Sequence, residues 1–242
     1  MTDDAGAARL HRLFADDSAF FARFQPLVDL QSGHVVAQAA SLHARTGSRE
    51  QTPTDLFTAA RDTDSVARLD RLGREVAIRD ASGWLGGQRL LVRVVAEMIA
   101  QPQLALDGLD IAARSAGVPM RQIVVEVQLT AGVDAFAHLA RVITRCRGTG
   151  CRVAVADAPD AATIRASVSM LAPDYIKLGR SLVSAPEADL RAAVEAGHAA
   201  QSTVIAFGVE SDQQRDLART CGADWGQGWA FGRPELPPSA SP

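Results

Sequence analysis

Short runs of apolar residues alternate along this chain with longer amphipathic stretches. The short runs are rich in leucine or β-branched residues, as buried strands are, and the longer stretches repeat their apolar positions at helical spacing. The pattern predicts eight strands, near residues 24–30, 35–42, 89–95, 122–127, 152–156, 174–178, 203–207 and 224–229.

The connections between these strands are of two kinds. Only "QSGH" (31–34) separates the first two, and Gly33 can take the positive φ that a tight turn needs, so we expect an antiparallel hairpin. The later gaps hold helical stretches such as 132–148 and 186–200, which are long enough to connect parallel strands. The sequence therefore predicts a modified TIM-like (β/α)8 barrel that starts with an antiparallel strand.

The length and composition of the chain agree with a single α/β barrel domain. The chain has 242 residues, 47% of them hydrophobic, and no Pro/Ser-rich linker divides it. We expect a single domain over 1–236 and a disordered tail, "PPSASP", over 237–242. No internal repeat is evident.

Charge and targeting signals argue against several partners. With 25 basic and 28 acidic residues the chain has no basic footprint for nucleic acid or an anionic membrane. The first residues lack the apolar run of a signal peptide, and no stretch reaches the ~20 apolar residues of a membrane span. A cytoplasmic location is expected.

Cysteine and histidine positions do not predict a metal site. The three cysteines are an odd number without ligand spacing, so we expect buried, reduced thiols. The histidines weighed as zinc ligands lack Cys, Asp or His partners at the required spacing: His34, His43 and His198.

Polar residues stand at the ends of six different predicted strands. In a parallel barrel these ends meet at one face, where active sites form. Each residue alone is compatible with a helix cap or a surface ion pair, but together they could hold a divalent cation and a phosphate. The six are Arg93, Glu126, Asp157, Lys177, Glu210 and Gln227.

Seven segments resemble, in order and spacing, the EAL domains, bacterial cyclic di-GMP phosphodiesterases whose modified barrel has an antiparallel first strand. The most specific segment is "CGADWGQGWAFGRP" (221–234), and the resemblance covers nearly the whole chain. The others are "FQPLVDLQSGHVVAQAASL" (24–42), "LLVRVV" (90–95), "IVVEVQL" (123–129), "VAVADAPD" (153–160), "APDYIKLGRSLV" (172–183) and "VIAFGVESDQQ" (204–214).

The resemblance implies a site with two Mg²⁺ or Mn²⁺ ions, and this chain departs from it at most positions. Ala39 stands for the glutamate of the family's name motif, Arg93 for an asparagine, and Ala156 for the first of two paired aspartates. Further departures are Leu129, Gly179 and Phe207; the matching positions are Glu126, Asp157, Lys177, Glu210 and Gln227.

These departures predict that the chain is not a working phosphodiesterase and keeps no metal cofactor. Removing several carboxylates deletes most of the coordination shell, and Arg93 adds a permanent positive charge. We expect Arg93 to reach both Glu126 and Asp157 in place of the missing cations. The alternative is that Arg93 points to solvent at the rim.

The leading interpretation is a regulatory module that binds an unidentified protein partner, with a homodimer as one form of that contact. The contact is expected around 158–200, where Ile164, Val168 and Leu171 recur at helical spacing beside Met170. The resemblance implies that loops connect the dimer contact to the active site. In those loops this chain has Leu129, Ala158 and Pro159 in place of the family's residues.

Two alternatives to this interpretation remain. The first is a receptor that binds cyclic di-GMP without hydrolysing it, and the second is a residual phosphodiesterase. His43 counts against the receptor, because it replaces an arginine that binds a ligand phosphate in related receptors. The residues expected to bind the ligand are Gln25, Pro26, Leu42, Lys177, Gln227, Gly228, Arg233 and Pro234.

Overall fold

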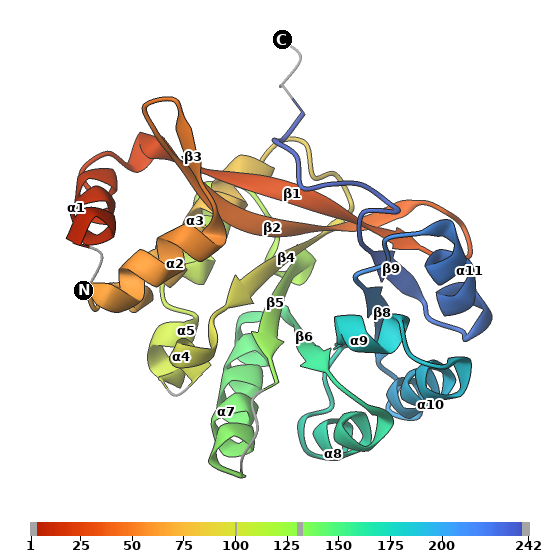
Figure 1. Cartoon of the computed structure of the whole chain (residues 1–242). Coiled ribbons are helices and arrows are strands. Elements are labelled where there is room, and N and C mark those ends of the chain that lie inside the picture. The colour runs from red at the N-terminus through yellow and green to blue at the C-terminus, as the bar shows by residue number, and fades with distance from the viewer. Residues whose placement is uncertain (1–3, 100, 130–132, 239–242) are drawn as a thin grey trace.

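A closed barrel of strands with helices around it forms this protein (Figure 1). The computed structural model describes residues 4–99, 101–129 and 133–238. The strands are β1 (Phe20–Asp29), β2 (Val35–Thr46), β3 (Arg49–Gln51), β4 (Arg89–Val94), β5 (Ile123–Gln128), β6 (Arg152–Ala158), β7 (Tyr175–Leu178), β8 (Thr203–Phe207) and β9 (Trp225–Gln227).

The sheet runs in the order β1-β9-β8-β7-β6-β5-β4-β2-β3, and a further pairing of β1 with β2 closes it. Strand β1 is antiparallel to both of its barrel neighbours, β2 and β9, while β2 and β4 to β9 run parallel. The predicted barrel with an antiparallel first strand is confirmed. The extra strand β3, which pairs only with β2, was not predicted because "REQ" offers no apolar run.

The hairpin between β1 and β2 forms as the sequence predicts. Gly33 has a φ of 74°, and its N–H donates to the carbonyl of Asp29 at 2.9 Å. The Asp29 carboxylate accepts from the N–H groups of Gln31 and Ser32, so the turn satisfies its own backbone donors.

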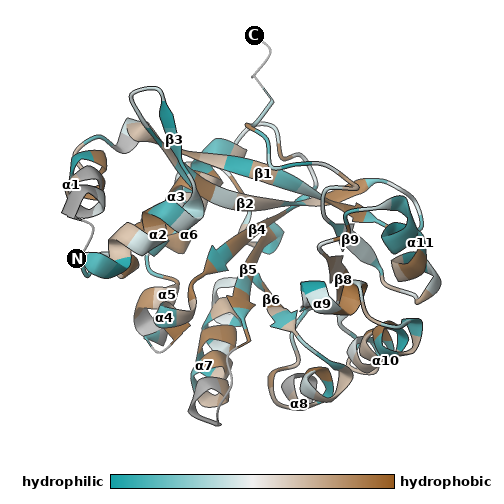
Figure 2. Ribbon diagram, viewed as in Figure 1, coloured by the Kyte–Doolittle hydropathy of each residue, from teal (hydrophilic) through white to brown (hydrophobic). Residues whose placement is uncertain are grey.

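Helices cover the outside of the barrel, and Figure 2 shows hydrophobic and hydrophilic residues on the same helices, as amphipathic packing requires. The predicted helices at 132–148 and 186–200 correspond to α7 and α10. The α-helices are α1 (Asp4–Leu13), α2 (Pro53–Asp62), α3 (Val66–Ala81), α4 (Ala96–Ile99), α5 (Pro102–Ala105), α6 (Leu109–Ser115), α7 (Val133–Thr149), α8 (Ala161–Leu171), α9 (Arg180–Val183), α10 (Glu187–His198) and α11 (Asp212–Thr220).

A layer of apolar side chains, one from each barrel strand, fills the barrel interior. Its members pack as one cluster, with Trp225 partly buried against it. The buried members are Leu27, Ala37, Leu91, Val124, Ala154, Tyr175 and Ile205. The barrel is therefore a packed core at this level, and any cavity has to lie beyond this layer.

The three cysteines are free and buried, as expected. Among the described residues, no group of three or more His, Cys, Asp or Glu side chains could hold a metal ion, and no helix is long and apolar enough to cross a membrane. Positions 239–242 of the predicted C-terminal tail lie outside the described residues.

Candidate functional site

The candidate site is the next layer of side chains above the interior core. Side chains on one face of a strand recur every second residue, so the residue two positions after each core residue faces the same way. Because β1 runs in the opposite direction, its contribution lies two positions earlier. This ring consists of Gln25, Ala39, Arg93, Glu126, Ala156, Lys177, Phe207 and Gln227.

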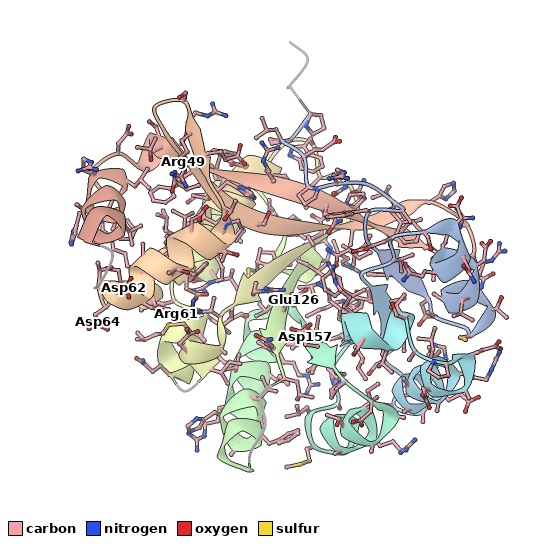
Figure 3. The ribbon with its side chains drawn as sticks, viewed as in Figure 1. Arg49, Arg61, Asp62, Asp64, Glu126 and Asp157 are labelled. Atoms are coloured by element: carbon pink, nitrogen blue, oxygen red, sulfur yellow. The ribbon has the colours of Figure 1, made fainter. Side chains whose placement is uncertain are left out.

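Strand register brings members of this ring together in pairs. Gln25 is the register partner of Ala39, and Arg93 is the partner of Glu126. Four of the six predicted strand-end residues, Arg93, Glu126, Lys177 and Gln227, therefore lie in this ring at one mouth of the barrel. Figure 3 labels Glu126 on β5 and Asp157 on β6, at the same end of these neighbouring strands.

Glu126 is the electrostatic centre of the mouth. It is 4% exposed, and its two carboxylate oxygens are both engaged. Lys177 donates from Nζ to Oε2 at 2.7 Å, and Arg93 donates from Nη2 and Nε to Oε1 at 2.8 and 3.1 Å. We call these three residues the Glu126 cluster.

The two cations decide the ionisation of Glu126. Burial opposes the charged form most strongly, but the charges of Lys177 and Arg93 together outweigh it, helped by their hydrogen bonds. The pKa of Glu126 falls from 4.5 to about 2 as a result. The carboxylate is ionised at neutral pH, with its positive partners already in place.

Phe207 completes the surroundings of Lys177. The Lys177 Nζ lies 4.2 Å from the centroid of the Phe207 ring, a cation–π distance, and the side chain of Lys177 is 3% exposed. The resemblance implies a glutamate at this position, so an aromatic face has taken the place of a carboxylate beside the lysine.

The prediction for Arg93 is right for one partner and wrong for the other. Its guanidinium pairs with Glu126, but within the described residues no hydrogen bond or ion pair joins it to Asp157. Asp157 acts only at longer range, as a minor contribution to the raised pKa of Arg93, behind the dominant charge of Glu126. The alternative that Arg93 points freely to solvent is also wrong, although its side chain is 55% exposed.

Backbone geometry explains why Asp157 does not reach Arg93. Asp157 has a φ of 62°, in the left-handed region, and the pairing of β6 with β7 shifts its register between Val155 and Ala158. Such a bulge changes the direction of the side chain relative to a regular strand. Aspartate is one of the few non-glycine residues that adopt this conformation readily.

The remaining matched positions divide between mouth and rim. Gln227 is buried and donates from Nε2 to Oε1 of Gln25 at 2.8 Å, and Gln25 in turn donates to the carbonyl of Gly232 at 2.9 Å. Glu210 instead pairs with Arg180 at 2.8 Å on the exposed rim and does not line the cavity. The six strand-end residues therefore do not come together in a single site.

A cavity of about 570 Å³ opens above the ring and extends toward helices α2, α3 and α4. Gln25, Leu42, Lys177, Gln227 and Pro234 line it, as the receptor hypothesis predicts. Three other predicted ligand residues do not line it: Pro26, Gly228 and Arg233. The Arg233 guanidinium lies over the Trp229 ring, 4.5 Å from its centroid. A Cβ added at Gly228 would lie 2.0 Å from the Val209 carbonyl oxygen, and one added at Gly232 would lie 2.9 Å from Pro26, so both glycines leave room only for hydrogen.

His43 does not line this cavity and is paired with Glu50 and with Ser41, which does line it. Its Nδ1 lies 2.9 Å from a Glu50 oxygen and its Nε2 lies 3.1 Å from the Ser41 hydroxyl. Burial, the largest cause, lowers the pKa of His43, and the charge of Glu50 opposes this shift. Among the described cavity-lining side chains His43 does not occur.

Two charged residues of the cavity wall were missed by the sequence reasoning. Asp70 and Arg74 on α3 are each 2% exposed, and Nη1 of Arg74 donates to Oδ2 of Asp70. Opposite charges four residues apart on a helix are typical of an exposed surface pair. The signal that could have revealed them is the neighbouring buried stripe of α3, which includes Leu69 and Ala77.

Most of the apolar side chains predicted for protein contact on α8 are buried within the protein. On α8, Ile164 is fully buried and Leu171 is 3% exposed, whereas Met170 is 62% exposed. The side chain of Val168 lies outside the described residues. The helical stripe therefore packs on the barrel, and Met170 is the exposed apolar group next to it.

An α/β barrel with an antiparallel first strand and a polar mouth defines the class of this protein. Comparison with known families narrows it: residues 7–234 match the EAL domain family, and the chain belongs to that family.

Solved structures agree with this fold. The FimX EAL domain from Pseudomonas aeruginosa bound to c-di-GMP has a TM-score of 0.83 at 18% identity, covering 95% of this chain and 96% of that one. The FimX EAL domain of Xanthomonas citri in complex with c-di-GMP gives 0.80 at 19% identity, covering 92% and 90%. The PaMucR phosphodiesterase in its c-di-GMP complex gives 0.79 at 20% identity, covering 95% and 97%.

One curated relative, an uncharacterized protein of Azorhizobium caulinodans, is 24% identical over 233 residues. The match covers 89% of this chain but only 31% of the relative, so the chain spans about a third of that protein's length.

Proposed function

We propose that this chain is a regulatory EAL domain that does not hydrolyse cyclic di-GMP. The observation that carries the proposal is the Glu126 cluster, in which Lys177 and Arg93 occupy both oxygens of the buried glutamate. In-line hydrolysis by two divalent ions needs several oxygen ligands that clamp both metals at one mouth.

The ring residues do not fit such a pair of ions. Ala39, Ala156 and Phe207 offer no side-chain oxygen, and the guanidinium of Arg93 would repel a metal beside Glu126. Displacing Lys177 and Arg93 would also leave a buried carboxylate to be neutralised by metal alone. We therefore propose that the domain works without a Mg²⁺ or Mn²⁺ cofactor.

Hydrolysis assays with millimolar Mg²⁺ or Mn²⁺ test this proposal. We expect no release of linear dinucleotide from the wild-type chain, and none from Ala39→Glu, because a two-metal centre needs its other ligands at the same time. Metal-dependent release by the wild type that Lys177→Ala abolishes would overturn the proposal.

The regulatory role is proposed to use the outside of the barrel as a protein-binding surface, in the first place for a second copy of the chain. The support is Met170, which leaves a large apolar side chain exposed on α8 in the segment 158–200. Ile111 on α6 is 61% exposed and provides a matched control elsewhere on the surface.

Light scattering at micromolar concentration measures this contact. We expect a dimer in the wild type and in Ile111→Glu, and a monomer in Met170→Glu. A wild-type monomer, or a dimer that survives Met170→Glu, would contradict this use of α8.

A second candidate, a cyclic di-GMP receptor without hydrolysis, is favoured by the cavity of about 570 Å³, which lies within the usual range for ligand sites. Lys177 and Arg93 could meet ligand phosphates directly, and the neighbours FimX and PaMucR are described in complex with c-di-GMP. Calorimetric titration with cyclic di-GMP in EDTA tests it: metal-independent binding supports the receptor, and no heat of binding excludes it.

A further inference from the structure

The C-terminal end of α7 brings two cysteines together. The N–H of Cys151 donates to the carbonyl of Cys146 at 3.2 Å, and the N–H of Gly150 donates to the carbonyl of Arg147 at 3.1 Å. Gly150 has a φ of 83°, so the helix ends in the left-handed conformation that glycine adopts without strain. These features define a Schellman motif, in which the side chains at the positions of Cys146 and Cys151 come into contact.

The two thiols share one small buried cluster with a hydroxyl group. Cys146 is 0% exposed and Cys151 is 4% exposed. The Cys151 Sγ lies 3.2 Å from the Cys146 carbonyl oxygen and 3.3 Å from the Thr149 hydroxyl, which itself donates to that carbonyl at 2.8 Å. The end of the helix therefore holds the Cys151 side chain against the turn that contains Cys146.

A direct interaction between the thiols makes their acidities different. A hydrogen bond with the Cys146 thiol lowers the pKa of Cys151 more than burial raises it, and the Thr149 hydroxyl adds to the lowering. The same hydrogen bond between the thiols, followed by burial, raises the pKa of Cys146. The thiolate is the reactive form of cysteine, so Cys151 is the more nucleophilic of the two and has a second thiol in contact with it.

Cys221 provides a contrast within the same chain. Its Sγ lies 3.8 Å from the carbonyl oxygen of Glu187, and burial raises the pKa of its thiol. It packs in a different hydrophobic cluster from Cys146 and Cys151. Cys221 therefore shares the burial of the pair but lacks a neighbouring thiol.

We propose that Cys146 and Cys151 are an oxidation site, at which a small peroxide joins them in a disulfide that fastens the last turn of α7 to the start of β6. The Cys151 thiolate attacks a peroxide oxygen, the S–O bond forms as the O–O bond breaks, and the hydroxide that leaves takes the thiol proton and becomes water. The Cys146 sulfur then attacks the Cys151 sulfur, and the S–S bond forms as the S–O bond breaks. The second hydroxide leaves as water with the Cys146 proton, so two thiols are oxidised and one peroxide is reduced to two waters.

The site lies where two outer helices meet. Helices α7 and α8 pack side by side on the outside of the barrel (Figure 1). Arg147, inside the loop that the disulfide closes, donates from Nη2 to the carbonyls of Leu171 and Ala172 at the end of α8. Oxidation therefore fixes the segment that holds the end of α8. The proposal depends neither on the chemistry of the barrel mouth nor on a bound nucleotide.

Peptide mapping of the full chain after treatment with hydrogen peroxide tests the proposal. The folded protein is treated, the remaining thiols are alkylated after unfolding, and trypsin is added without a reductant. A Cys146–Cys151 disulfide then links two peptides, 146–147 and 148–152, that are otherwise separate. The cleavage sites that separate them follow Arg145, Arg147 and Arg152.

We expect the linked species in the wild type, two hydrogens lighter than the sum of its two peptides, and Cys221 recovered in its alkylated form. Cys221→Ser should give the same linked species, whereas Cys146→Ser and Cys151→Ser should give none. Circular dichroism establishes that each variant is folded, and the wild-type map decides the outcome even if a variant fails to fold.

Oxidation in guanidinium chloride separates the effect of the fold from closeness in the sequence. In buffers of oxidised and reduced glutathione, we expect the equilibrium constant for the disulfide to be at least about tenfold larger in the native chain than in the unfolded one, because the helix end already holds the thiols together.

Equal constants in the two states would show that α7 does not position the thiols, and would overturn the proposal. Three unreacted thiols in the native chain after peroxide treatment would overturn it as well. So would a product in which Cys146 or Cys151 gains oxygen without forming the disulfide, or in which Cys221 reacts first.

Discussion

Two buried carboxylates at the same cavity, Glu126 on β5 and Asp70 on α3, have opposite electrostatic outcomes. Glu126 has two cationic partners, and the pKa of its carboxyl falls to about 2. Asp70 has one cationic partner, Arg74, and burial raises the pKa of Asp70 despite that charge and the Val95 N–H. A single guanidinium does not compensate the desolvation of a fully buried carboxylate here, whereas two cations do.

The two pairs also differ in how completely their polar atoms are hydrogen-bonded. In the Glu126 cluster both carboxylate oxygens accept hydrogen bonds from cationic side chains. The Asp70–Arg74 pair leaves one edge of a guanidinium unused.

The largest expected effect is on the Glu126 cluster. Lys177→Met removes the buried cation and leaves Glu126 with the half-exposed Arg93 alone, and we expect a loss of about 3 kcal/mol in the free energy of unfolding. Arg93→Ala keeps Lys177 and removes a side chain that is 55% exposed, so about 1 kcal/mol is expected. Urea denaturation at pH 7 measures both.

Equal losses for these two variants would show that exposure does not distinguish the partners of Glu126. A larger loss for Arg93→Ala would reverse the ranking and make the guanidinium the main counter-ion.

The next effect is a pH dependence of opposite sign for the two carboxylates. Glu126 has its pKa lowered from 4.5 to about 2, so its stabilisation is complete above pH ~4.5 and is lost as the pH falls toward 2, about 3 kcal/mol in all. Asp70 has its pKa raised from 3.8, so its contribution is complete below pH ~3.8 and is lost as the pH rises through the folded-state pKa.

Chemical denaturation between pH 2.5 and 7 separates the two contributions. Glu126→Gln should flatten the acid loss of stability, and Asp70→Asn should not. An unchanged acid slope in Glu126→Gln would mean that other carboxylates carry the acid sensitivity of the protein.

Much of the fold was predictable because buried side chains recur at a different spacing in strands than in helices, and the apolar residues of the sequence show that spacing. All eight barrel strands, the Gly33 hairpin and the mouth positions of Glu126, Lys177 and Gln227 follow from that pattern and from the resemblance. Strand β3 was missed because three polar residues carry no period.

The side-chain partners were harder to predict because they depend on local backbone geometry and on packing between distant segments. The Asp157 bulge could not be seen in "VAVADAPD", which reads as a regular strand end. The spacing of Asp70 and Arg74 is typical of a surface ion pair, whereas the packing of α3 in the structure buries both side chains. Sequence periodicity predicts which face is buried, but not which charges that face includes.

The smallest expected effect tests the bulge. Because the carboxylate of Asp157 lacks a hydrogen bond or ion pair to any described residue, Asp157→Asn should change the free energy of unfolding at pH 7 by no more than about 0.5 kcal/mol. Asparagine also tolerates the left-handed φ, so this variant isolates the charge; Asp157→Ala, which does not, should cost about 1 kcal/mol through the backbone alone. If Asp157→Asn costs as much as Arg93→Ala, the aspartate does pair with Arg93 in solution, and the mouth holds a four-membered charge cluster in place of the Glu126 cluster.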